Sequence, residues 1–248
     1  MARIRHLSRA PIAEAVIDFR VQSREGFAAD SFLPVAERLK TRYPLTQPIE
    51  SLAATFGFQE GKPTPADTTF SRLGLFLKTQ DEQSIAQFRT DGFTFSRLPQ
   101  YTSWEEVLPE ALTLWRAYRE ASKPSKVTRL AVRYINRLRF ALPSDLSMYV
   151  TAPPGIPESL PQQLRSYLTR LILSDVENGN SVIVTQATEP SSDPDHIVVL
   201  LDVDAYRDVG DMDPNNDHRI EDILGSLRML KNRVFFGSIT ERTVEMYE

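Results

Sequence analysis

The chain has 248 residues, of which 41% are hydrophobic and 25% charged, which suits one large soluble domain or two small ones. It contains no cysteine, and this excludes disulfides, thiolate metal sites and a cysteine nucleophile. The net charge of −4 argues against a generic nucleic-acid binder, and the chain has neither a signal-peptide pattern nor a run of 18 apolar residues. We therefore expect a cytoplasmic protein that does not engage the membrane.

The first half of the chain, residues 1–124, has the pattern of a strand, a helix, several strands and a second helix. Apolar spacing predicts helices over 32–39, after Ser31 as a candidate N-cap, and over 104–118, where Ser103 and Glu106 form a capping box. Pro109 is expected to kink the second helix or to mark its true start. Alternating residues predict strands at 14–21, near 51–59, near 70–79, near 84–90 and at 92–97.

The second half, residues 125–248, repeats that order. It opens with a strand over 129–140, and a helix is then expected over 160–171, with Ser159 and Gln162 as a second capping-box candidate. Strands follow near 181–188 and 196–206, and a closing helix covers 220–230.

This order predicts an α+β fold in which two similar strand-helix-strands-helix halves form one curved antiparallel sheet with the helices on one face. The arrangement is analogous to that of the TATA-box-binding protein, whose two pseudo-symmetric halves share a curved sheet. We expect an internal duplication and one composite domain, with the boundary between the halves at 123–125.

Four segments in order along the chain resemble a sporadically distributed, functionally uncharacterised prokaryotic family of similar length. They are APIAEAVIDFR at 10–20, RYINR at 133–137, LDVD at 201–204 and FFGSIT at 235–240. The resemblance covers nearly the whole chain, but it implies no catalytic residue and no substrate.

The strand over 129–140 is the main candidate for a binding site. Side chains alternate between the two faces of a strand, so one face is apolar and the other carries Arg129, Arg133, Arg137 and Arg139. We favour ion pairs between these arginines and acids of the same chain. A protein partner, a nucleic-acid backbone and a small anion are the alternatives.

Two pairs of acids are the candidates for partners of those arginines. Glu14 and Asp18 share a strand face, and if the opening strands of the halves are neighbours, they would meet Arg133 and Arg137. Asp202 and Asp204 share another face and would form salt bridges to the arginines or, less favoured, hold a metal ion.

Two further polar features have simple structural interpretations. Asn136 lies on the apolar face of its strand, and we expect its amide to bond the backbone of a loop or bulge, with a ligand-orienting role as the alternative. The alternating acids of 211–217 weakly resemble a calcium loop, but a loop leading into a helix N-terminus explains them better.

No phosphate-binding, nucleophile-elbow or metalloprotease motif occurs, so we lean against an enzyme and expect no cofactor and no bound metal. The leading hypothesis is a non-enzymatic binding or regulatory protein that recognises a protein partner through a charged sheet face. The alternative is a nucleic-acid-binding protein that uses the arginine strand, with metal-dependent hydrolysis at Asp202 and Asp204.

Overall fold

A computed structural model describes residues 2–55, 58–59, 62–63, 67–99, 101–142, 145–190, 193 and 195–248. The main strands are β1 (Ile12–Gln22), β2 (Leu45–Thr55), β5 (Asp67–Lys78), β6 (Ser84–Arg89), β7 (Gly92–Arg97), β8 (Lys126–Ala141), β9 (Leu168–Asp175), β10 (Asn180–Glu189) and β11 (His196–Met212). The α-helices are α1 (Leu33–Leu39), α2 (Trp104–Ser122), α3 (Asp217–Ser238) and α4 (Glu241–Glu245). Short elements complete the fold: β3 (Phe58–Gln59), β4 (Lys62–Pro63) and the 3-10 turns Ala29–Phe32, Leu146–Met148 and Val176–Asn178.

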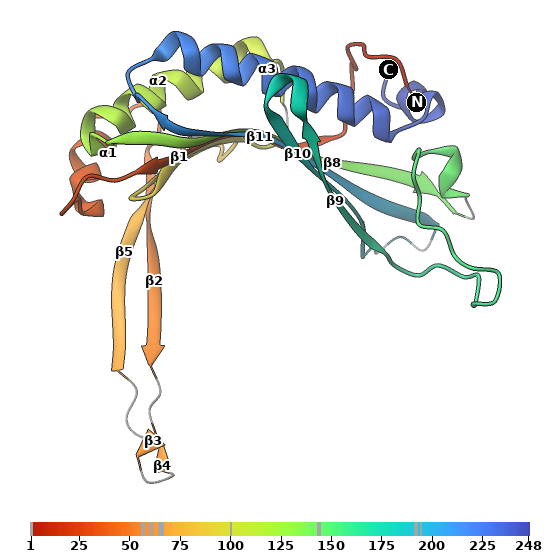
Figure 1. Ribbon diagram of the computed structural model, residues 1–248, viewed down its shortest axis with the longest axis horizontal. Coiled ribbons are helices and arrows are strands. Elements are labelled where there is room, and N and C mark those ends of the chain that lie inside the picture. Colours follow the sequence, from red (N-terminus) through yellow and green to blue (C-terminus); the bar gives the residue numbers. More distant parts are fainter. Residues whose placement is uncertain are drawn as a thin grey trace.

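The fold is α+β, as the sequence predicted, and is built on one large antiparallel sheet. Its nine strands follow the order β2-β5-β6-β7-β1-β8-β11-β10-β9. Helices α2 and α3 cover one face, and the sheet curves away from them, so that the opposite face lines the inside of an arch (Figure 1). We call this helix-free surface the inner face.

Strands β1 and β8 lie side by side at the centre of the sheet. Strand β7 pairs with β1 and leads into α2, and β11 pairs with β8 and leads into α3. The strands that open the two halves are therefore neighbours, which brings the arginines of β8 close to the acids of β1.

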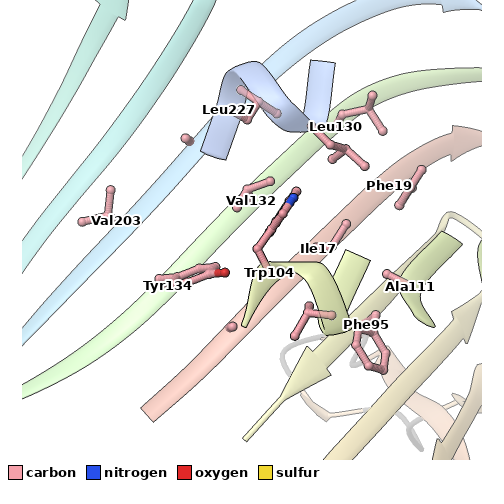
Figure 2. Packing of buried hydrophobic residues seen from close by; sticks show 14 of the residues in the cluster. Ile17, Phe19, Phe95, Trp104, Ala111, Leu130, Val132, Tyr134, Val203 and Leu227 are labelled. Carbon is pink, nitrogen blue, oxygen red and sulfur yellow. The ribbon is translucent and has the colours of Figure 1, made fainter. Parts of the chain in front are cut away.

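The hydrophobic core lies between the sheet and the two long helices. Ile17 and Phe19 of β1, Leu130 and Tyr134 of β8, and Trp104 of α2 meet there (Figure 2). Burying each large apolar side chain contributes about 1.5–3 kcal/mol, so this contact holds the helices on their face of the sheet.

The helix predicted over 160–171 is wrong. Residues 161–167 have no regular structure, and Leu168 begins β9, which pairs with β10 along its whole length. Pro161 would lack a backbone donor inside a helix, and Gln162 Nε2 donates to the carbonyls of Pro157 and Leu160 instead of closing a capping box. The second half therefore lacks the helix predicted to follow its opening strand.

Smaller differences concern helix starts and strand ends. The helix expected from residue 32 begins at Leu33, preceded by a 3-10 turn that includes Ser31. Ser103 is the N-cap of α2 but makes no capping hydrogen bond, and the helix continues through Pro109. The strand predicted near 51–59 begins earlier, at Leu45, while residues 56 and 57 lie outside the described residues.

Candidate functional site on the inner face of the sheet

The arginines of β8 lie on the inner face, as the alternation predicted. Leu130, Val132, Tyr134, Leu138 and Phe140 are buried toward the helices together with Asn136, and the residues that alternate with them point the other way. Arg133, Arg137 and Arg139 are exposed, whereas Arg129 is half-buried.

Each arginine is paired with an acid of the same chain. Arg129 Nη2 lies 3.0 Å from Asp204, and Arg137 Nε lies 2.6 Å from Glu189. Arg133 donates to both carboxylate oxygens of Asp202, at 2.9 and 2.7 Å. Arg139 pairs with Asp193. The inner face therefore presents interleaved positive and negative groups along β8, which is the internal pairing that the sequence favoured.

The predicted pairing of Glu14 and Asp18 with Arg133 and Arg137 is wrong. In the antiparallel register Asp18 lies opposite Ala131, and its carboxylate approaches Arg129 at 3.6 Å, on the other side of Ala131 from Arg133. Glu14 lies opposite Ile135 and forms no salt bridge among the described residues, although its charge helps to raise the pKa of Arg133. Strand direction, which the sequence does not reveal, decides which acid meets which arginine.

Asp18 is the centre of a polar cluster. It accepts a hydrogen bond of 2.6 Å from Thr94 Oγ1, and the guanidiniums of Arg20, Arg89 and Arg129 lie within 3.3–3.6 Å of its oxygens. The cluster borders a hollow of about 440 Å³ in the inner face.

Asp204 lines the same hollow. Burial raises the pKa of Asp204, and the nearby Arg129 guanidinium opposes that rise. One oxygen of Asp18 and one of Asp204 are buried without a hydrogen-bond partner in the described chain. The Asp18 oxygen still lies 3.3 Å from Arg20 and 3.6 Å from Arg129, so it is held by charge without an aligned hydrogen bond.

A metal ion held by Asp202 and Asp204 would have no third His, Asp or Glu ligand among the described residues. The Asp202 carboxylate is held by Arg133 and that of Asp204 by Arg129. Within the described ranges, no three His, Asp or Glu side chains come together in a metal-binding arrangement.

The two other polar features behave as structural elements. Asn136 is buried, and its amide nitrogen donates to the carbonyls of Leu201 and Tyr134, so it bonds strand backbone where β1 has an irregular register. In the acidic loop Asn216 accepts from Arg219 N at 3.1 Å and so caps α3. Asp217 pairs with Arg119 at 2.7 Å, and Asp211 pairs with Lys126, so the loop leads into a capped helix N-terminus as the sequence predicted.

The inner face also has an apolar part that the sequence analysis missed. Residues opposite each other in neighbouring strands share a face, and one such row runs from Ile172 of β9 through Ile183 of β10 and Asp204 of β11 to Arg133. Ile172 is 63% exposed, and Leu168, two alternations along β9, is 71% exposed. A correct strand assignment for 168–175 would have placed both on this face.

No protein-family model and no curated protein matches this chain. Among the described helices, none has the length and apolar character needed to cross a membrane.

Proposed function

We propose that this protein is a non-enzymatic binding module whose protein partner docks on the inner face of the sheet. The observation that carries the proposal is the interleaving of charge along β8, where each of the four arginines already has an acid beside it. Such a face offers donors and acceptors of both signs, as the surface of another folded protein does.

The apolar side chains of β9 support the same proposal. Protein interfaces combine an apolar centre with a polar rim, and Ile172 and Leu168 lie exposed next to the charged strands. β9 is also an edge strand, so its outer backbone groups are free to pair with a strand of the partner.

A nucleic-acid backbone is less well matched. Phosphates are bound by basic side chains that release counterions, and binding then falls steeply with salt. The arginines of β8 are instead neutralised in pairs, while the chain as a whole carries a net charge of −4. The inner face is therefore better suited to a protein than to nucleic acid, and nuclease treatment in the capture experiment distinguishes the two.

The test is capture of partners from the cytoplasm of the native host by the tagged protein, with and without nuclease treatment. Ile172→Asp places a charge in the apolar part of the inner face, and Arg137→Glu removes one of its cations. We expect both variants to lose the captured protein, because a desolvated charge or a reversed pair at an interface costs more than tenfold in affinity.

Arg38→Glu is the matched control. Arg38 is an exposed, ion-paired arginine of α1, which lies outside the inner face, and its reversal should leave capture unchanged. Capture that survives both inner-face variants would contradict the proposal, and so would a partner released by nuclease.

We also propose that the fold arose by duplication of one strand-helix unit. Pairing of β7 with β1 and of β11 with β8, each followed by a long helix, supports a duplicated origin and the analogy with the TATA-box-binding protein. Superposing β1, β7 and α2 on β8, β11 and α3 tests it, and a mismatch in helix direction would reject it.

A further inference from the structure

A second hollow, on the helix side of the sheet, is independent of the inner face. It has a volume of about 560 Å³ and is bordered by residues 4–12, by the start of α2, by β8 and by α3. Aromatic rings form much of its lining: Tyr101, Trp104, Tyr134 and Phe235. Its size falls in the range of small-molecule sites, which are mostly apolar with a few polar groups.

Lys231 of α3 lies in this hollow and is only 7% exposed. Its Nζ sits 3.6 Å from the centre of the Tyr134 ring. Within the described part of the chain it has neither an ion pair nor a hydrogen bond. Burial lowers the pKa of Lys231 to about 7, and the neighbouring Arg228 acts in the same direction.

The other charged groups of the hollow already have partners. Arg228 lies 3.1 Å from Glu105, and Arg5 lies 2.7 Å from Glu241. An anion that enters would therefore find Lys231 as the one buried cation without a counterion in the described lining. Half-buried Asn232, the next residue along α3, also lines the hollow and could donate a hydrogen bond.

We propose that this hollow binds a small aromatic carboxylate, whose carboxylate pairs with Lys231 Nζ while its ring packs against Trp104 and Phe235. The ligand carboxylate would give the buried Lys231 amine a counterion, which it lacks in the described part of the free protein. The ligand ring would pack against aromatic side chains that already line the hollow. This site is separate from the protein-binding face, so either proposal can fail without the other.

The test is titration calorimetry of the purified chain with benzoate and phenylacetate, with benzyl alcohol as the uncharged analogue. We expect millimolar or tighter binding of at least one carboxylate and no comparable binding of the alcohol. Lys231→Met, which keeps length but removes the charge, should weaken carboxylate binding at least about tenfold, since a charge-assisted hydrogen bond is lost. Lys40→Met, at an exposed lysine that follows α1, should bind like the parent.

The pH dependence supplies a readout that a purely structural lysine would not give. Only the protonated amine attracts a carboxylate, so affinity should fall as the pH rises above about 7 in the parent chain. The other ionisable groups at the hollow are Arg5, His6, Tyr101, Glu105, Tyr134 and Arg228. Because a histidine can also change charge near neutral pH, His6→Gln is included and should preserve the slope.

Three results would overturn the proposal. They are no binding of either carboxylate at millimolar concentration, equal binding of benzyl alcohol, and carboxylate binding that Lys231→Met leaves intact. Circular dichroism of each variant checks the fold, and with an unchanged spectrum a loss of binding in Lys231→Met reports the amine itself.

Discussion

Lys231 is the only lysine or arginine that is buried among the described residues, and it carries the clearest stability prediction. The unfolded chain keeps the amine protonated up to a pKa near 10.5, whereas burial lowers the pKa to about 7 in the fold. Between these values the unfolded state binds the extra proton, so the stability of the parent chain rises with pH. Lys231→Met should raise the free energy of unfolding by about 2–4 kcal/mol at pH 7, and the gain should shrink toward pH 10.

Urea unfolding of both chains at several pH values measures this difference. Lys40→Met is the control, since that amine is exposed and its loss should change stability little at any pH. A gain from Lys231→Met that stayed constant from pH 7 to pH 10 would contradict the assigned charge penalty.

For single residues, the sequence predicts which face of a strand a side chain occupies better than it predicts the partner of that side chain. Alternation alone placed the arginines of β8 on one face. The partners of Arg137 and Arg139 are Glu189 and Asp193, which are more than 50 residues away in the sequence. They come close to β8 because β11, the strand that follows them, pairs with β8. Lys231 was detectable: it follows Leu227 by four residues and so continues the apolar face of α3.

Among the elements, the contact between β1 and β7 is unusually close at Gly92. A Cβ at this position would overlap the carbonyl oxygen of Phe19 in the neighbouring strand, so any larger residue forces the strands apart. Gly92→Ala should therefore destabilise the fold by about 1–3 kcal/mol, as overpacking does in closely packed cores. Thermal unfolding measures the loss.

Gly155→Ala is the comparison for that variant. No atom lies near a Cβ built at Gly155, and its backbone is not in the left-handed region, so the melting temperature should hardly change. Equal effects of the two substitutions would show that the close approach of β1 and β7 is not what makes Gly92 necessary.

Elements were predictable where one periodicity dominated. Strands β6, β7, β8 and β10 follow their predicted spans closely, because their side chains fit a single period. The helix predicted over 220–230 exists, but α3 is twice as long and runs from Asp217 to Ser238. Strand β9 was mistaken for part of a helix because Leu164, Leu168 and Leu171 have helical spacing. Pairing with β10 decided the outcome, and that contact is not visible in the local sequence.

The whole molecule is held together across the boundary that the sequence suggested at 123–125. Strands β1 and β8, one from each half, pair side by side, and both contribute to one hydrophobic cluster. Helices α2 and α3 are joined by ion pairs of 2.7 Å, between Arg119 and Asp217, and 3.1 Å, between Arg228 and Glu105. Neither half can open without exposing apolar surface of the other.

We therefore expect the chain to unfold in one cooperative step. The two tryptophans, Trp104 and Trp115, are both buried in α2. Trp115 packs on Phe19 and Phe93 and reports on the first half, Trp104 lies beside Arg228 and reports on the contact between the halves, and far-UV circular dichroism follows both halves. Denaturant titrations observed by the two methods should have the same midpoint and slope. Two circular-dichroism transitions with only one of them visible in fluorescence would instead show that the halves are separate domains, and the shared sheet would then contribute less to stability than its extent suggests.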